Sequence, residues 1–179
     1  HSALLYSASE ISVLDPSQLA HHPYIAKLGP DALDEQITWR DILSRLQEKA
    51  FHRRSLAALY LDQKFVAGIG NYLRTEILHK SGLDPFARPC DLTRRQLGLL
   101  ARNTLELSRQ AYATAGITNT PGRVKSLKAA GITRSRYRHL AFARKGQDCY
   151  ACAASIQRIE VSGRRIYFCP HCQSETRQS

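Results

Sequence analysis

The sequence contains no methionine, a single tryptophan and no apolar stretch long enough to cross a membrane. A membrane-spanning helix needs about 20 consecutive apolar residues, and a secretory signal needs an apolar run behind a basic start. Neither pattern occurs, so a membrane protein and a secreted precursor are both disfavoured. Because position 1 is His1 and residues 1–8 look like part of a strand, we expect the 179 residues to belong to a longer chain.

Acidic residues are missing from a long stretch of the sequence. Between Glu106 and Asp148 there is none, while nine lysines and arginines occur there. The first fifty residues carry four basic and seven acidic side chains, and the remainder carries 22 and 8, so the net charge of +11 arises in residues 51–179. Such one-sided charge favours a polyanion such as nucleic acid, although a merely solvated basic face is the simpler alternative.

Only five cysteines are present, and four of them form two Cys-x-x-Cys pairs separated by sixteen residues. This spacing is typical of a four-thiolate tetrahedral Zn²⁺ site. Two disulfides or four unrelated buried thiols are the alternatives, and disulfides belong mainly to secreted proteins. His171 lies inside the second pair and is not needed by a complete shell, and Cys90 remains as a lone thiol. The predicted metal ligands are Cys149, Cys152, Cys169 and Cys172.

The sixteen residues between the two pairs have the pattern of a β-hairpin. Residues 156–160 are expected to form the outgoing strand, residues 161–164 the turn and residues 165–168 the returning strand. Gly163 gives the turn the backbone freedom that it needs. The end of the sequence therefore predicts a zinc ribbon.

Capping residues and apolar periodicity predict helices upstream of this ribbon. After a short helix near residues 15–21, four helices are expected at 38–50, 55–61, 72–80 and 93–115. Thr93 and Gln96 form a capping box for the last of these. Residues 117–135 are expected to be a loop with at most a helical turn near 124–130. The face of the last helix that is expected to be buried consists of Leu97, Ala101, Thr104, Leu105, Ser108 and Tyr112.

The predicted fold is therefore mainly α, with a helical bundle followed by the four-cysteine hairpin. Between the second and third helices lies Gly68-Ile-Gly-Asn71. Gly68 and Gly70 let the backbone approach a ligand, and the start of the next helix offers free amides and a partial positive charge to a phosphate. Asn71 adds a side-chain donor. A tight connection that binds nothing is the alternative.

Two runs of sequence resemble a known family. Residues 59–78, LYLDQKFVAGIGNYLRTEIL, are similar to the helix-two-turn-helix motif of the Fpg/Nei DNA glycosylases, and residues 163–173, GRRIYFCPHCQ, to their zinc finger. The Asn-Tyr-Leu-Arg that follows the glycines resembles the bacterial endonuclease VIII branch, as do residues 22–30 and 111–114. The resemblance covers most of the chain and is weakest at 117–140.

The resemblance implies roles for individual residues. Asn71, in the loop with Gly68 and Gly70, matches the asparagine that holds a phosphate near the lesion. Arg164 matches the arginine at the hairpin tip that reaches the phosphates of the flipped-out nucleotide and takes part in the final elimination. Lys27 matches a DNA-contacting arginine and keeps its charge, though not its bidentate geometry.

The resemblance also implies the activity of an intact protein. Family members remove an oxidised base and cut the strand by β,δ-elimination, using an N-terminal proline amine followed by a glutamate. His1-Ser2 does not supply these groups, so the chain is predicted to be the DNA-binding part of such an enzyme acting on oxidised pyrimidines. A non-enzymatic zinc-ribbon nucleic-acid module is the alternative.

The predicted organisation has three parts. Residues 1–30 are expected to end an N-terminal β-domain and form a linker, residues 31–140 to form the helix-two-turn-helix domain, and residues 141–179 the zinc finger. The expected partner is damaged double-stranded DNA, and no membrane is expected. The protein is expected to be a monomer in the bacterial cytoplasm.

Overall fold

The structure is a computed structural model that describes residues 11, 13–19 and 21–174. The strand predicted at residues 1–8 lies outside the described residues. A single helical turn, α1 (Pro16–Leu19), begins with a proline, where the fixed φ of this residue suits a helix start. A 3₁₀ turn, η1 (Ile25–Lys27), then leads into the helical bundle.

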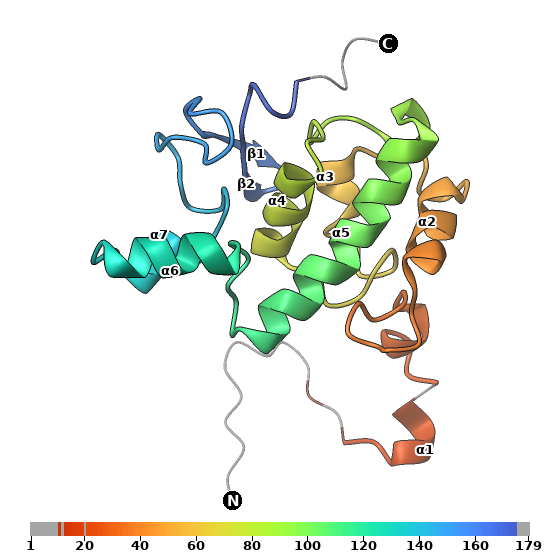
Figure 1. The fold of residues 1–179 in the computed structure, drawn as a ribbon. Coiled ribbons are helices and arrows are strands. Elements are labelled where there is room, and N and C mark those ends of the chain that lie inside the picture. The colour runs from red at the N-terminus through yellow and green to blue at the C-terminus, as the bar shows by residue number, and fades with distance from the viewer. Residues whose placement is uncertain (1–10, 12, 20, 175–179) are drawn as a thin grey trace, which may run out of the picture.

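Four helices form the bundle in the order that the sequence predicts: α2 (Trp39–Gln47), α3 (Leu56–Leu59), α4 (Asn71–Lys80) and α5 (Arg94–Ala113). In Figure 1, α5 crosses the molecule with α2 on one side and α4 on the other. A 3₁₀ turn, η2 (Pro89–Asp91), precedes α5. Helices α2 and α3 are shorter than expected, because the last residues of each predicted segment turn away from helical geometry.

Local capping accounts for the start of the two amphipathic helices. Thr38 and Asp41 form a capping box at α2, and Thr93 with Gln96 forms the predicted box at α5. Each box pairs amides of the first turn that have no partner within the helix. The start of α5 is therefore confirmed, and its end comes two residues before the predicted one.

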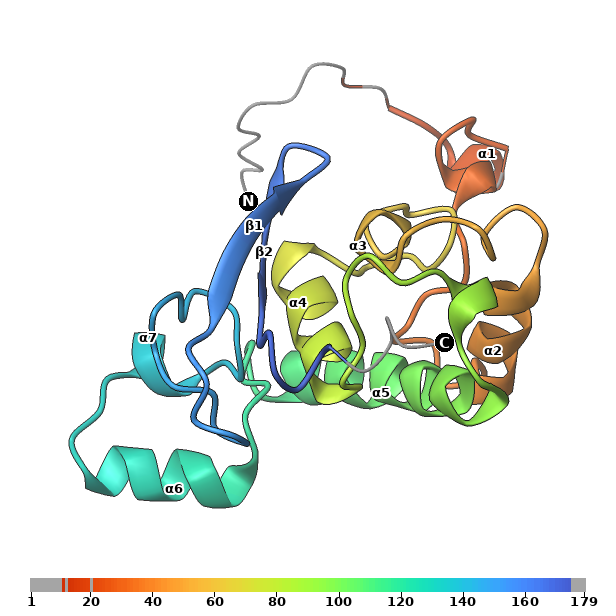
Figure 2. The same cartoon turned by 90° about the horizontal axis from the view of Figure 1, so that it is seen from above.

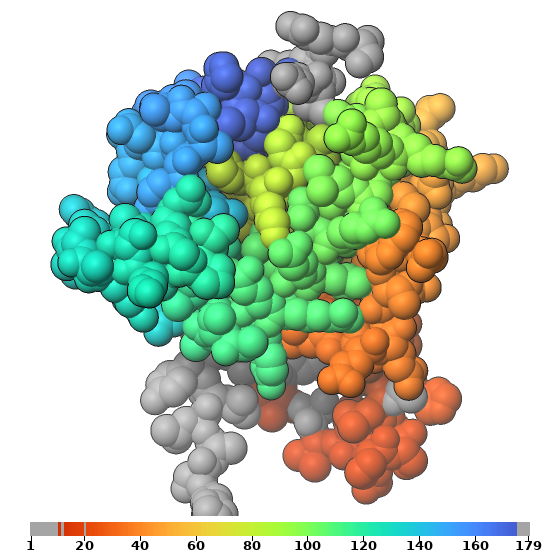
Figure 3. All heavy atoms as spheres, in the orientation of Figure 1, coloured from red at the N-terminus to blue at the C-terminus, as the bar shows by residue number. Residues whose placement is uncertain are grey.

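The core of the bundle surrounds α4. The seven consecutive residues from Leu73 to His79 are all buried, so α4 has no solvent-facing stripe over that length. In the space-filling view of Figure 3, α4 is seen only as a strip between α5 and the C-terminal finger. Its sequence includes arginine and glutamate, and both of these buried side chains have hydrogen-bond partners in other segments of the chain.

The hairpin consists of β1 (Gln157–Val161) and β2 (Arg164–Phe168), which are antiparallel. Val161 pairs with Arg164, so the turn is the two residues Ser162 and Gly163, both with positive φ, at 53° and 69°. Two such residues define the turn type whose twist matches that of the strands. The hairpin is confirmed with a shorter turn than expected. Figure 2 shows it standing beside α4.

Two expectations about the middle of the chain are wrong. Residues 117–135 are not a loop: Thr120 caps a nine-residue helix, α6 (Pro121–Ala129), and a short helix, α7 (Arg134–Tyr137), follows. Pro121 occupies the first turn of α6, where its missing amide proton is not needed. Tyr112, expected on the buried face of α5, is 76% exposed.

The overall class, helices followed by a two-stranded hairpin with four close cysteines, agrees with the prediction. Within the residues described, no helix has the length and apolar character needed to cross a membrane.

Candidate metal and nucleic-acid site

The four predicted cysteine ligands meet at one point. Their sulfur atoms all lie within 4.8 Å of one another, with 3.9 Å between Cys149 and Cys172 and 3.4 Å between Cys152 and Cys169. Sulfurs that surround a zinc ion tetrahedrally at about 2.3 Å are about 3.8 Å apart. The cluster therefore has the donor set and the size for a four-thiolate metal ion. His171 is exposed and is not part of this group.

Backbone amides hold two of the sulfurs in place. The amide of Ala151 donates to Cys149 Sγ at 3.5 Å, and the amide of Cys172 donates to Cys169 Sγ at 3.4 Å. A backbone hydrogen bond at Ala154 and the neighbouring Cys172 lower the pKa of the Cys152 thiol to about 6. Burial and the adjacent sulfurs instead raise the pKa of Cys172. Four thiols this close together favour a cation that all of them can share.

The glycine loop before α4 is held open by a glutamine. Gly68, with φ of +84°, donates its amide to Gln63 Oε1 at 3.0 Å, and Gln63 Nε2 donates to the carbonyl of Ile69 at 3.0 Å. Gly70 is the N-cap of α4, and no atom lies within 4 Å of the place where a Cβ would be. Asn71 is thus the first residue of the helix, and the open backbone lies at Gly70.

Asn71 joins this loop to the hairpin. Its Nδ2 donates to the carbonyl of Arg165 at 2.8 Å, and its Oδ1 accepts from Arg74 Nη2 at 2.6 Å. Arg74 also donates to the carbonyls of Ala57 at 2.7 Å and Arg165 at 3.2 Å. The side chain of Asn71 therefore fixes the glycine loop against β2 and is only partly available to a ligand.

Arg74 is a site residue that the sequence did not reveal. Its side chain is fully buried beneath the loop, and burial, with the nearby charge of Arg164, lowers its pKa to about 10. The guanidinium thus stays charged at neutral pH and pairs with carbonyl and amide oxygens in place of a carboxylate. The sequence does show an arginine among apolar helix residues, which could have indicated a buried site. However, its backbone partners, Ala57 and Arg165, lie 17 and 91 positions away.

Arg164 lies next to this junction. It is exposed at the first position of β2, beside the turn, and no hydrogen bond or ion pair of its side chain occurs within residues 13–174 as described. The carbonyl that Asn71 binds belongs to the next residue along the chain. Arg164 and the glycine loop therefore share one region of the surface, with the guanidinium free for an anion.

Lys27 lies near residues 61–64, the segment that precedes the glycine loop. Lys27 is exposed in η1. Together with residues 61–64 it lines a cavity of about 270 Å³. The linker is fixed there because the amide of Gly29 donates to the carbonyl of Gln63, and a Cβ on Gly29 would lie 2.5 Å from a carbonyl oxygen. Lys27 is thus not brought together with Asn71 and Arg164.

A second cavity opens beside the glycine loop. It has a volume of about 390 Å³, and its lining includes Gly68, Tyr72, Asp31 and Arg138. Tyr72 belongs to a row of rings in which His139, Phe142 and Tyr167 are 5.2–5.4 Å from their neighbours. This row connects the cavity to the finger.

The segment that carries these rings is held by a buried carboxylate, Glu76, which the sequence also failed to indicate. Glu76 accepts the amides of Leu140 at 2.6 Å and of Ala141 and Phe142 at 2.8 Å each, and the hydroxyl of Thr118 donates to it as well. Burial raises the pKa of Glu76, and these four hydrogen bonds oppose the rise.

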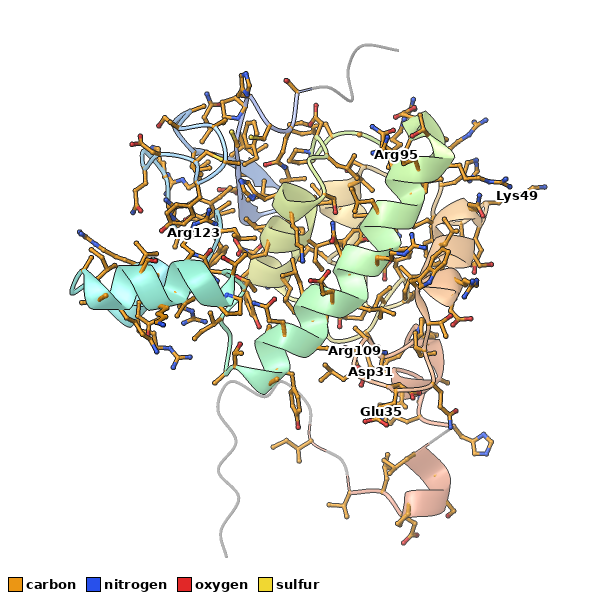
Figure 4. All side chains as sticks on the ribbon, in the orientation of Figure 1. Asp31, Glu35, Lys49, Arg95, Arg109 and Arg123 are labelled. Carbon is orange, nitrogen blue, oxygen red and sulfur yellow. The ribbon has the colours of Figure 1, made fainter. Side chains whose placement is uncertain are left out.

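Arg123 of α6 connects the same region to the first cysteine pair. Its guanidinium lies 4.6 Å from the ring centroid of Tyr150, and Arg144 lies 3.5 Å from the same ring. Figure 4 shows Arg123 between α6 and the finger. Another labelled side chain, Arg109, donates to the carbonyls of Asp34 and Ile37 and so attaches the segment before α2 to α5.

Comparison with known proteins gives the family. The sequence profile of the formamidopyrimidine-DNA glycosylase H2TH domain matches residues 28–121, which is more than half of the chain. The chain belongs to the Fpg/Nei family. The matched residues include the glycine loop and α4, and the hairpin with its four close cysteines is consistent with the C-terminal zinc finger of that fold.

Individual Fpg/Nei relatives agree with this assignment. The chain is 42% identical to Endonuclease 8 of Escherichia coli (strain K12 / DH10B) and 40% identical to that of Salmonella arizonae, over 95% of its own length and 61% of theirs. It thus spans less than two thirds of the curated relatives.

Solved structures show the same fold. The MutM (Fpg) protein of Thermus thermophilus superposes with a TM-score of 0.68 at 30% identity, over 86% of this chain and 56% of that one. Lactococcus lactis Fpg, in complex with DNA that contains an abasic site, gives 0.71 at 23% identity, over 89% and 56%. The second likeness concerns the fold alone.

Proposed function

We propose that this chain is the DNA-binding C-terminal part of a base-excision-repair DNA glycosylase and AP lyase that acts on oxidised pyrimidines by β,δ-elimination. The single observation that carries the proposal is the hydrogen bond from Asn71 to the carbonyl of Arg165. It joins the glycine loop and the tip of the hairpin into one surface. Membership of the Fpg/Nei family supports damaged double-stranded DNA as the partner of that surface.

Moving a nucleotide out of the DNA stack takes a few kcal/mol. The physical task of this surface is to hold the bent DNA backbone while the nucleotide is out. In the proposal, the first amides of α4 receive one phosphate, Gly68 and Gly70 leave room for the backbone to approach it, and Asn71 lies beside it. Arg164 receives another through charge-assisted hydrogen bonds and assists the elimination. Lys27 contributes a more distant contact to the backbone.

We propose that Cys149, Cys152, Cys169 and Cys172 hold a Zn²⁺ ion. The size of the sulfur cluster and its four-thiol donor set support zinc. A zinc ion with four thiolates has no free coordination position, so it would supply structural stability to the hairpin and no reaction chemistry. Arg164 and the neighbouring Arg165 carbonyl then depend on the metal for their position.

The proposed organisation has the helix-two-turn-helix domain at residues 31–140 and the finger at 141–179, with residues 1–30 as a linker and the end of a β-domain. Packing of Ala141 and Phe142 with the finger cluster supports the second boundary. The family's proline amine and glutamate have no counterpart in the chain, so the intact enzyme would supply them from another domain. We propose a monomer that works in the bacterial cytoplasm.

Filter binding to a duplex with an abasic-site analogue tests the proposed surface. Arg164→Ala is expected to weaken binding about tenfold and to lower the slope of log Kobs against log salt by about 0.9, because one phosphate contact is lost. Arg158→Ala, an exposed arginine nearer the middle of the hairpin, is the matched control and is expected to change binding little. Equal effects of the two substitutions would contradict the role of Arg164.

Borohydride reduction tests the assignment of the chemistry to groups outside this chain. With abasic DNA the 179-residue chain is expected to bind without forming a trapped covalent adduct. An adduct would overturn that assignment. Equal affinity for intact and abasic duplexes would instead support a nucleic-acid module without a role in repair.

A further inference from the structure

His79 connects α4 to the sulfur cluster. Its Nε2 lies 3.5 Å from Cys149 Sγ, although the two residues are 70 positions apart in the sequence. The imidazole is 9% exposed, and Cys149 is 3% exposed. This distance is within the range for a hydrogen bond to sulfur, so a side chain of the helical domain reaches a proposed metal ligand.

We infer that His79 donates its Nε2 proton to the Cys149 thiolate and thereby positions the metal site relative to α4. The inference rests on the proposed zinc site and adds a residue to it. A metal-bound thiolate has no proton to give, so any hydrogen bond between these two atoms requires the proton on nitrogen. The opposite tautomer would direct the lone pair of Nε2 at a negatively charged sulfur.

The surroundings of the other ring nitrogen, Nδ1, agree with this tautomer. Within the described part of the chain, His79 Nδ1 is buried and has no protein partner. A proton on Nδ1 would have no protein acceptor, whereas a proton on Nε2 has the thiolate. Cys149 already accepts the amide of Ala151 at 3.5 Å, so His79 would give this sulfur its second N–H donor.

The bond has a consequence for the whole of α4, because this helix would then contact the finger at both ends. Asn71 and Arg74 bind the carbonyl of Arg165 at the start of the helix, and His79 binds Cys149 near its end. In Figure 2, α4 lies alongside the hairpin over its length. Hydrogen bonds to metal ligands orient them, and their loss typically weakens metal binding about 10–100-fold.

Zinc release from the 179-residue chain to a chromogenic chelator tests the inference. His79→Leu is expected to release zinc about tenfold faster than the unsubstituted chain. His79→Gln keeps an N–H donor at similar reach and is expected to fall between the two. His171→Leu, an exposed histidine inside the second cysteine pair, is the matched control and should leave the rate unchanged. Equal release from His79→Leu and the unsubstituted chain, or equally fast release from both His79 variants, would overturn the inference.

The tautomer of His79 can also be measured directly, and this measurement does not depend on whether His79→Leu folds. In the zinc-loaded chain, the ring ¹⁵N shifts of His79, assigned by their loss in His79→Gln, are expected to show a protonated Nε2 and a bare Nδ1. The opposite tautomer would contradict the inference and leave the zinc proposal intact. If the unsubstituted chain bound no zinc, both the proposed metal site and this inference would be rejected.

Discussion

Single residues in this protein act through hydrogen bonds that span the chain. Glu76, Arg74 and Asn71 lie on one helix, and each binds backbone groups outside it: Glu76 binds the amides at 140–142, and Arg74 and Asn71 share the carbonyl of Arg165. Most buried polar groups in folded proteins are paired, because an unpaired one lowers stability. These side chains therefore determine where the finger and the segment at 139–142 lie relative to α4.

Glu76→Ala is expected to lower the free energy of unfolding by about 3 kcal/mol or more, because three backbone amides lose their acceptor and each unpaired buried group costs about 1–3 kcal/mol. Urea unfolding measures the change. Glu106→Ala removes an acidic residue whose side chain is 59% exposed and pairs with Lys80. That control is expected to cost less than about 1 kcal/mol. Similar losses in the two variants would show that the three amides find other partners.

His139 should make stability depend on pH. It is buried, and burial, assisted by the charge of Arg138, lowers its pKa to about 4. In the unfolded chain its pKa is about 6.5, so between these values the unfolded state binds a proton that the folded state does not. The free energy of unfolding should therefore fall as pH decreases from about 6.5 to 4, by at most about 1.4 kcal/mol per pH unit.

Urea unfolding of zinc-saturated protein at several pH values measures this contribution. His139→Gln is expected to reduce the slope between about pH 6.5 and 4, and the slope that remains includes His79, whose pKa burial also lowers to about 4. His21→Gln, which replaces an exposed histidine, should leave it as it is. A curve for His139→Gln parallel to that of the unsubstituted chain would mean that another group is responsible.

At the scale of elements, two turns position the site. Gly68 requires a positive φ before α4, and the turn at Ser162 and Gly163 places Arg164 at the start of β2. Helix α6 is different, because Thr120 and Pro121 start it in a stretch rich in glycine, threonine and serine. Backbone conformation therefore matters more at these points than side-chain size.

Gly163→Ala is expected to destabilise the chain by about 1–2 kcal/mol, since a Cβ is unfavourable at its φ of +69°. Gly122→Ala is the matched substitution in the first turn of α6, where no atom lies within 4 Å of the new Cβ and φ is not positive. It is expected to stabilise by up to about 1 kcal/mol. Thermal unfolding of both variants gives the comparison, and equal shifts would contradict the assigned turn.

At the scale of the whole molecule, the apolar side chains form two clusters, one mainly in the helical bundle and one in the finger, and Ile166 of β2 belongs to the first of them. The larger cluster contains Leu46, Leu59 and Leu100, and the smaller one contains Cys149, Ile156 and Tyr167. Because the bundle has its own core, loss of the metal should loosen the finger while most helices persist.

Removal of zinc with a chelator is therefore expected to reduce affinity for abasic DNA at least tenfold while most helical circular dichroism remains. The reason is that Arg164 and the carbonyl bound by Asn71 both belong to the hairpin. Added zinc should restore binding. Undiminished affinity after metal removal would show that the finger does not hold the DNA.

The sequence by itself determined the local features: the cysteine spacing, the hairpin, the glycine loop and the capping box at Thr93. Each of these depends on residues within a few positions of one another, so a short pattern is enough to predict it. The family resemblance, carried by residues 59–78 and 163–173, is confirmed by the match to residues 28–121. The roles of Asn71, Arg164 and Lys27 remain predictions.

Only the tertiary structure decided which distant groups meet. In the structure, Asn71 binds Arg165 and His79 lies beside Cys149. Arg74 and Glu76 of α4 are buried, whereas Tyr112 is exposed. The helix at residues 121–129 is a different case, because its cap and its first-turn proline are local signals that a composition typical of loops concealed. Burial and long-range hydrogen bonds depend on how whole elements pack, and no short pattern carries that information.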